Sequence, residues 1–235
     1  LQRSKYLFMT MKAERKEMPA TVESITIENL LPRVFENSVE TASEVWRRRI
    51  TFRRGRHYII EAESGTGKSS LCAFLYGSRK DYLGSICFGD TDTSTLDIED
   101  WQRLRRTAIA YLPQDLDLFP ELTAMENVEI KRCLTDAVRQ TEVKEWFRMT
   151  GIADRADFPC GKMSVGQQQR TAIVRALCQP FDFLILDEPV SHLDAENNRR
   201  CADIIIKEAQ RRGAAIIATS VGNKLYLPDA EILRL

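Results

Sequence analysis

The segment 163–194 restricts the possible folds of this chain more than any other part of its sequence. It opens with Met-Ser-Val-Gly-Gln-Gln-Gln-Arg, in which Ser164 and Gln167 have the spacing of a capping box that starts a helix. Gly166, beside the cap, allows another segment to approach the helix start closely, because glycine has no side chain. The apolar residues that follow, as far as Leu177, have the spacing of a helix with one buried face.

A short apolar run, 183–186, follows this helix and ends in two adjacent acids. The sequence Phe-Leu-Ile-Leu is typical of a strand that is covered on both faces. Asp187 and Glu188 then place two carboxylates at the end of a buried strand, where charges are costly. The pair therefore indicates a bound cation or a proton-transfer role.

An earlier segment has the pattern of a phosphate-binding loop. Residues 57–60 predict a strand and 71–76 predict an apolar helix, so the loop 62–69 lies between a strand and a helix. The glycines of this loop let successive backbone N–H groups turn toward an anion at the helix N-terminus. Lys68 adds a positive charge for the outer phosphates, and Ser69 adds a hydroxyl for Mg²⁺.

Taken together, these segments resemble the ATP-binding cassette (ABC) ATPases. The loop 62–69 resembles the Walker A motif, and Gln114, which follows Tyr-Leu-Pro, resembles the Q-loop. Residues 163–167 resemble the signature motif, 183–188 resemble Walker B with its catalytic glutamate, and 191–194 resemble the D-loop. The motifs stand in the order and spacing of the family, so the resemblance extends over nearly the whole chain.

The resemblance implies an α/β fold of the P-loop NTPase (RecA-like) type. Such a fold has a core with a mainly parallel sheet, an N-terminal antiparallel β subdomain and an inserted α-helical subdomain. The implied ABC ATPase domain covers 21–235, with the helical subdomain at 115–162. Residues 1–20 are polar, without the apolar segment of a signal peptide, and are expected to form a poorly ordered tail.

The resemblance also implies ATP hydrolysis and assigns roles to individual residues. Glu188 polarises the attacking water as general base. Ser69 and Gln114 bind Mg²⁺ directly, and Asp187 holds the ion through water. The ATP-binding residues of the Walker A motif are Ser64, Gly65, Thr66, Gly67, Lys68, Ser69 and Ser70.

The signature motif is expected to act in the opposite subunit of a dimer. Its residues lie at a helix N-terminus, which in this family faces the γ-phosphate of the other subunit's ATP. These residues are Ser164, Val165, Gly166 and Gln167. Asp194 belongs to the D-loop and is also expected to cap a helix over 195–212.

An aromatic ring that stacks on adenine is a further feature of the family. Phe35 is the main candidate for this role, and Tyr6 and Trp46 are secondary ones. A purely structural role for Phe35 in the core explains its position equally well.

Three residues depart from the family's motifs. Ala62 stands at a usual glycine of Walker A, and looser forms of that motif accept alanine. Val165 replaces the first glycine of the signature, where a β-branched side chain disfavours a positive φ. Ser220, in Thr-Ser-Val, occupies the position of the switch histidine and is expected to act there as a hydrogen-bond donor only. The last two departures predict slower hydrolysis.

Further local patterns predict the remaining elements. The arginine-rich segment 46–56 reads as a solvated antiparallel hairpin that turns at Gly55. A contact of these arginines with anionic lipid or with nucleotide is the alternative. Thr123 and Glu126 form a capping box that opens a helix. Other strands are expected at 24–27, 84–88, 108–112 and 214–219, and other helices at 99–106 and 141–150.

Composition excludes several classes of protein. Acidic and basic residues balance at 34 each, which argues against a nucleic-acid-binding protein. No apolar run is long enough to span a membrane. The 6 cysteines are scattered without a CxxC motif, as in a protein with reduced thiols, and the 2 histidines exclude a histidine-rich metal centre.

These observations lead to an ATP-binding and hydrolysing subunit of an ABC transporter. It is expected to dimerise, with a second copy or a paralogous subunit, and to drive a separate integral membrane permease from the cytoplasmic face of the membrane. The segment 119–128 resembles the subgroup that serves lipoprotein release, macrolide export and cell division. An ATP-gated regulatory subunit that scarcely hydrolyses ATP is the alternative. The ABC ATPases of DNA repair are excluded, because they carry a long heptad-rich insertion.

Overall fold

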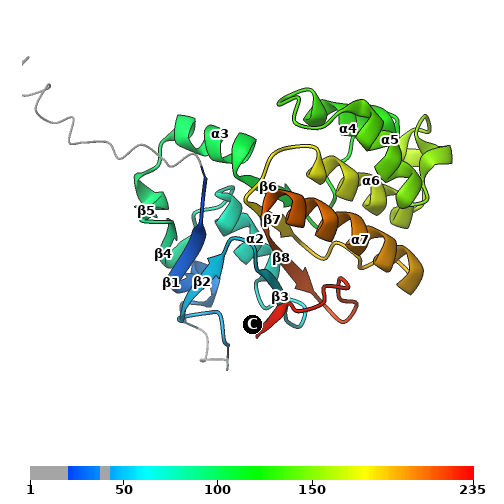
Figure 1. Cartoon of the computed structure of the whole chain (residues 1–235). Helices are drawn as coiled ribbons and strands as arrows, with labels where there is room; N and C mark the ends of the chain where they lie inside the picture. The colour runs from blue at the N-terminus through cyan, green and yellow to red at the C-terminus, as the bar shows by residue number, and fades with distance from the viewer. Residues whose placement is uncertain (1–20, 38–42) are drawn as a thin grey trace, which may run out of the picture.

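The molecule contains two β-sheets, of which sheet A lies at the left and sheet B nearer the centre of Figure 1. The computed structural model describes residues 21–37 and 43–235, so the expected tail 1–20, with Tyr6, lies outside the described residues. Sheet A is antiparallel, in the order β2-β1-β4-β5, and contains β1 (Ser24–Pro32), β2 (Arg49–Arg53), β4 (Tyr82–Phe88) and β5 (Thr91–Asp92). Sheet B is parallel, in the order β6-β7-β8-β3-β9, and contains β3 (His57–Glu61), β6 (Ile109–Leu112), β7 (Phe183–Leu186), β8 (Ala215–Ser220) and β9 (Glu231–Arg234).

The predicted helices are present, although the first begins at Lys68, three residues before its predicted start at residue 71. They are α2 (Lys68–Tyr76), α3 (Ile98–Thr107), α4 (Ala124–Arg132), α5 (Gln140–Met149), α6 (Val165–Leu177) and α7 (Ala195–Arg212). Short 3₁₀ turns occur at Arg33–Phe35, Thr93–Thr95, Ala153–Arg155 and Cys160–Lys162. The capping boxes predicted at Thr123 and Ser164 are confirmed at the starts of α4 and α6.

Sheet B is covered on both faces, which explains the continuous apolar run of β7. Successive side chains of a strand point to opposite faces. Phe183 and Ile185 pack with α2 and sheet A, whereas Leu184 and Leu186 pack with α6 and α7. All the residues of β7 are buried and apolar, so the strand itself adds no polar side chain to the site at its end.

The expected hairpin at Gly55 is wrong. Gly55 does turn, with φ of 74°, but β2 pairs with β1 in sheet A, whereas β3 pairs with β8 and β9 in sheet B. The reason is burial: Tyr58, Ile59 and Ile60 of β3 are all buried, so this strand needs cover on both faces. The turn therefore connects the two sheets.

The segment 115–162 forms a helical layer on one side of the molecule (Figure 1). Its helices α4 and α5 pack on α6, and an isolated bridge between Thr123 and Pro159 joins its beginning to its end. Apolar residues of this layer, such as Val128 and Phe147, belong to the same core cluster as α6 and α7. Its status as a separate subdomain stays a prediction.

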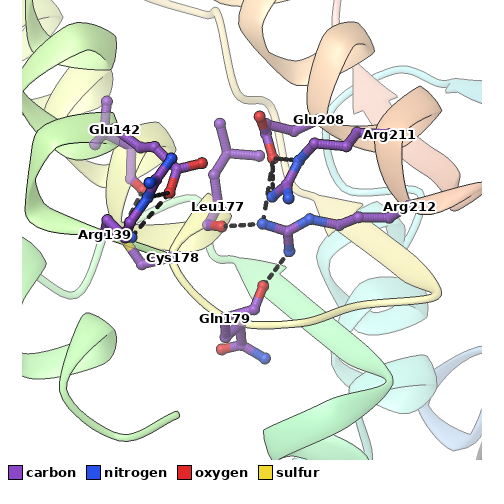
Figure 2. A network of polar contacts seen from close by, with 9 residues as sticks. Arg139, Glu142, Leu177, Cys178, Gln179, Glu208, Arg211 and Arg212 are labelled. Atoms are coloured by element: carbon purple, nitrogen blue, oxygen red, sulfur yellow. Dashed lines mark hydrogen bonds and ion pairs between the residues drawn. The ribbon is translucent and has the colours of Figure 1, made fainter. Parts of the chain in front are cut away.

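A buried polar network fixes the passage from α6 into β7 (Figure 2). Arg212, at the end of α7, donates to the carbonyl oxygen of Leu177 at 2.9 Å and to that of Gln179. Leu177 is the last residue of α6, where carbonyl oxygens lack an intrahelical partner. Glu208 accepts from Arg212 at 3.3 Å and from Arg211 at 2.7 Å, and its side chain is buried. The network thereby anchors the segment that delivers β7, and the acids after it, to the site.

None of the helices in 21–37 and 43–235 has both the length and the apolar character needed to cross a bilayer.

Candidate functional site

The loop that follows β3 ends in an open helix N-terminus. Gly65 and Gly67 have φ of 82° and 98°, a left-handed region that glycine adopts without strain. Gly67 is the N-cap of α2, and no side chain caps this helix or adds an acid to its first turn. The first backbone N–H groups of α2 are therefore free to bind an anion.

Lys68 joins this loop to the acids at the end of β7. Its side chain is only 4% exposed, and its Nζ donates to the carbonyl oxygen of Glu63 at 2.7 Å. The same Nζ lies 3.9 Å from Oε1 of Glu188. The structure therefore brings the predicted phosphate-binding lysine and the predicted general base together.

Asp187 is held by a residue whose importance the sequence did not indicate. The Oγ1 of Thr219, in β8, donates to Oδ1 of Asp187 at 2.7 Å and accepts from the N–H of Glu188 at 3.0 Å. The register of Leu186 with Ala218 in the pairing of β7 with β8 places the next residues, Asp187 and Thr219, side by side, and this pairing joins strands that are far apart in the sequence.

Glu188 has a backbone conformation that is unusual for its residue type. Its φ is 48°, in the left-handed region, where a non-glycine residue stores conformational strain. Its N–H is bound by Thr219, and its carbonyl oxygen accepts from Nε2 of Gln169 at 3.0 Å. These two contacts bind the N–H and the carbonyl oxygen of Glu188 and so fix its strained backbone.

The oxygens of the predicted Mg²⁺ ligands suit a hard divalent cation. Ser69 Oγ donates to Oε1 of Gln114 at 3.3 Å, so these two predicted ligands are adjacent. The second carboxylate oxygen of Asp187, Oδ2, is buried without a hydrogen-bond partner among residues 21–37 and 43–235. An unpaired buried carboxylate oxygen is costly, and a cation bound directly or through water would satisfy it.

Burial also shapes the electrostatics beneath these acids. The pKa of the Cys72 thiol, on α2, is raised well above its usual range by burial and next by the charge of Asp187. The pKa of Tyr111 is raised by burial, with a smaller contribution from Asp187. Both groups therefore stay neutral beneath the acids.

Ser70 and Ser220 are turned away from the loop centre. Ser70 Oγ accepts from Nη1 of Arg79 at 2.9 Å. Ser220 is buried at the end of β8, and its hydroxyl donates to the carbonyl oxygen of Asn223 at 3.1 Å. The predicted hydrogen-bond donor at the switch position is therefore engaged within its own turn.

The signature residues form the start of α6. Ser164 and Gln167 hydrogen-bond to each other in both directions of the capping box, at 3.0 and 3.3 Å. Val165 is 49% exposed, and because it is the first residue of a regular helix, the expected conflict with a positive φ does not arise. A Cβ on Gly166 would lie 3.0 Å from the carbonyl oxygen of His192, so a side chain here would crowd the backbone of the D-loop.

Gln169 connects α6 to the D-loop and was missed by the sequence analysis. Its Nε2 donates to Ser191 Oγ at 3.2 Å, and its Oε1 accepts from the N–H of His192 at 3.1 Å. Asp194 accepts from the N–H of Asn197 at 2.8 Å and caps α7, and this contact is the main reason why the pKa of Asp194 is lowered. The start of α6, the D-loop and Glu188 thus form one connected unit.

The aromatic candidates lie against the loop. Phe35 ends a 3₁₀ turn and is partly buried, and a Cβ on Gly67 would lie 3.0 Å from a carbon of its ring. Trp46 is buried, and its Nε1 donates to the carbonyl oxygen of Thr66 at 3.0 Å. Tyr6 lies outside the described residues.

Comparisons with known proteins agree on one family. Residues 45–191 match the model of the family described as ABC transporter. The lipoprotein-releasing system ATP-binding protein LolD 1 of Caulobacter vibrioides is 28% identical over 86% of this chain and 92% of its own length. The uncharacterized ABC transporter ATP-binding protein YbbA of Escherichia coli is 30% identical over 79% of this chain and 83% of its length.

Two further comparisons cover a larger relative and a solved structure. The macrolide export ATP-binding/permease protein MacB of Salmonella choleraesuis is 34% identical over 70% of this chain, but the match spans only 26% of MacB. The dimeric structure of MJ0796, a bacterial ABC transporter cassette, superposes with a TM-score of 0.72 at 24% identity, over 89% of this chain and 94% of that one. At this identity the structural likeness shows the fold, which is the fold that the sequence predicted.

Proposed function

Because this chain belongs to the ABC transporter family, as an ATP-binding subunit, we propose that it hydrolyses ATP at the site between the loop 62–69 and the acids that follow β7. The observation that carries this proposal is the 3.9 Å approach of Lys68 to Glu188 beside the open N-terminus of α2. The ammonium group of Lys68, the carboxylate of Glu188 and the first N–H groups of α2 meet there, as transfer of a phosphoryl group to water requires.

The loop supplies the contacts to phosphate. The amides of the loop and of the first turn of α2 bind the phosphate oxygens, and Lys68 neutralises their charge. Lys68 is already held by the carbonyl oxygen of Glu63 at 2.7 Å, so its ammonium group is positioned before the nucleotide binds. Ser70 contributes through its N–H, because its hydroxyl is bound to Arg79.

Ser69, Gln114 and Asp187 would hold Mg²⁺, and their oxygens fit this ion. When bound, the ion supplies charge neutralisation on the phosphates. Glu188 is the general base that accepts the proton of the attacking water. Thr219 and Gln169 fix the backbone of Glu188 and so determine where its carboxylate stands.

A test of the base assignment is the rate of ATP hydrolysis by Glu188→Gln. We expect hydrolysis to be abolished while ATP binding is kept, because glutamine preserves the shape but cannot accept the proton. Glu63→Gln is the matched control, since the exposed Glu63 contributes only its backbone carbonyl oxygen to the site. Hydrolysis by Glu188→Gln at the wild-type rate would contradict the assignment.

The subunit works as a dimer, with the start of α6 placed against the ATP of the other subunit. Ser164, Val165, Gly166 and Gln167 would supply that contact. In Glu188→Gln, saturating ATP with Mg²⁺ should convert monomer to dimer in size-exclusion chromatography. A persistent monomer would exclude a homodimer and leave a paralogous subunit as the partner.

The membrane partner binds the surface that precedes and opens α4. Phe119 is 53% exposed there, although its N–H donates to Oδ1 of Asn127 at 2.8 Å and its carbonyl oxygen accepts from Nδ2 at 3.0 Å. A large apolar side chain that is exposed on such a fixed backbone suits a docking surface. Leu118, Leu122 and Met125 would line the same surface. The subunit would thus lie on the inner face of the cell membrane through its permease, and Phe119→Asp should abolish co-purification with that permease.

A slow, ATP-gated regulatory subunit is the second candidate function. The observation that favours it is the hydroxyl of Ser220, which is bound to Asn223 and is no substitute for an imidazole. Turnover measured with and without the membrane partner separates the two functions. A rate that stays near the uncatalysed rate even with the partner would favour the regulatory role.

A further inference from the structure

Trp46 makes a contact that neither a core residue nor an adenine-stacking residue requires. Its side chain is buried in the cluster between sheet A and α2, and its only polar atom, Nε1, donates to the carbonyl oxygen of Thr66 at 3.0 Å. Thr66 belongs to the loop 62–69. A buried indole thus forms a hydrogen bond to the backbone of the phosphate-binding loop.

The direction of this hydrogen bond determines the direction of a backbone N–H group. A trans peptide unit is planar, so its C=O and N–H point to opposite sides. The peptide that carries the Thr66 carbonyl also carries the N–H of Gly67. When the carbonyl is held toward Trp46, the N–H of Gly67 is turned to the other side of the peptide, away from the indole.

Further contacts fix the position of the indole relative to the loop. Ser43 Oγ, which is buried, accepts from the N–H of Trp46 at 2.8 Å and from that of Val45 at 3.1 Å, so the backbone at Trp46 is fixed. A Cβ on Gly67 would lie 3.0 Å from ring atoms of both Trp46 and Phe35. A side chain at Gly67 would crowd both rings, and the φ of 98° would strain it as well, so the loop packs closely on these two rings.

We propose that Trp46 is a positioning residue for phosphate binding: it orients the Thr66–Gly67 peptide so that the N–H of Gly67 points at the phosphates. This inference rests on the proposed function, because it assumes that the loop binds the phosphates of ATP. It assigns Trp46 a role through the loop backbone and excludes stacking of its ring on adenine, since the indole is buried against the loop.

The test replaces Trp46 by phenylalanine, which keeps an aromatic ring and removes the N–H. Binding of ADP and of inorganic pyrophosphate is measured by calorimetry. Loss of one neutral hydrogen bond should weaken both ligands by the same factor, on the order of three- to tenfold. Pyrophosphate has no base, so an equal loss shows that Trp46 acts on the phosphates.

Trp101→Phe is the matched control. Trp101 is also buried, but its Nε1 has no hydrogen-bond partner in the described part of the chain, so the same substitution removes no hydrogen bond to the loop. This variant should bind both ligands as the wild type does. In Trp101→Phe the remaining indoles are Trp46 and Trp146, and Trp46 is hydrogen-bonded to the loop, so pyrophosphate should still change the tryptophan emission.

The outcomes separate this inference from the proposed function. If the wild type binds neither ADP nor pyrophosphate, the proposed function itself fails. If the wild type binds both and Trp46→Phe binds both equally well, the inference is wrong. A loss for ADP without a loss for pyrophosphate would also overturn it, because the indole would then act on the base. Unchanged emission of Trp101→Phe on binding pyrophosphate contradicts it independently of whether Trp46→Phe folds.

Discussion

Thr219 Oγ1 donates a hydrogen bond to Asp187 Oδ1 over 2.7 Å, between the ends of two neighbouring parallel strands. The same oxygen accepts from the N–H of Glu188, so one hydroxyl holds both acids. It keeps one oxygen of Asp187 satisfied and leaves the other, Oδ2, as the buried atom that a cation would satisfy.

Replacing this hydroxyl should therefore affect stability and turnover together. In Thr219→Val the shape is kept, but Asp187 loses its donor and the N–H of Glu188 loses its acceptor. We expect a loss of about 1–3 kcal/mol in the free energy of unfolding, measured with urea, and a clear fall in kcat. Thr219→Ser keeps the hydroxyl and is the control. Equal turnover in the Val and Ser variants would show that the hydroxyl does not position the acids.

The network at the end of α7 allows the contribution of a buried ion pair to the free energy of unfolding to be compared with that of an exposed one. Glu208 and Arg212 form an i,i+4 pair in which both side chains are largely buried, and Arg212 also binds the end of α6 (Figure 2). Glu208→Ala leaves Arg212 without a carboxylate, which typically costs about 3–5 kcal/mol for a buried pair.

The control for this experiment lies on the same helix. Glu196 and Arg200 form an i,i+4 pair that is exposed, so Glu196→Ala should change the free energy of unfolding very little. Chemical denaturation of both variants measures the difference. Similar losses in the two variants would show that burial does not govern these pairs.

The cysteines predict a dependence on pH. Burial raises the pKa of Cys178 and that of Cys201 to about 12. Free thiols in the unfolded chain ionise near pH 8.5, so the unfolded state gains charge first and stability should fall as the pH rises from about 9 toward 12. The thiolate is the reactive form, so both thiols should resist a thiol reagent at pH 8, while the exposed Cys133 reacts. Rapid labelling of Cys178 in the folded protein would contradict this.

Local patterns predicted the elements well, and contacts between distant segments were not accessible to them. The capping boxes at Ser164 and Thr123 and the cap at Asp194 depend on residues three positions apart, so the sequence carries the whole signal. The passage of the chain at Gly55 from one sheet to the other reflects the buried run 58–60, but the strands that pair with β3 are β8 and β9, which lie far away in the sequence.

The candidate site shows the same division. The sequence predicts Lys68, Asp187 and Glu188 from their motifs, and the structure brings them together. The sequence does not predict the contact of Trp46 with Thr66 or the contact of Gln169 with Glu188. Both are side-chain hydrogen bonds to the backbone of a distant loop. Such contacts depend on the direction of single carbonyl groups, which no residue pattern specifies.

Ser220 separates the two candidate functions, rapid ATP hydrolysis and a slow, ATP-gated regulatory role. The last prediction concerns its hydroxyl. That hydroxyl is bound to the carbonyl oxygen of Asn223 in a buried turn at the end of β8. If it stays there when ATP binds, Ser220→Ala should leave the single-turnover rate within about threefold of the wild type, because a transition-state hydrogen bond would be worth about 10²–10³ in rate. Glu188→Gln, measured in parallel, should abolish turnover. A fall of a hundredfold or more in Ser220→Ala would instead show that the hydroxyl leaves Asn223 and acts on the reacting phosphate, and the basis for slow hydrolysis would be lost.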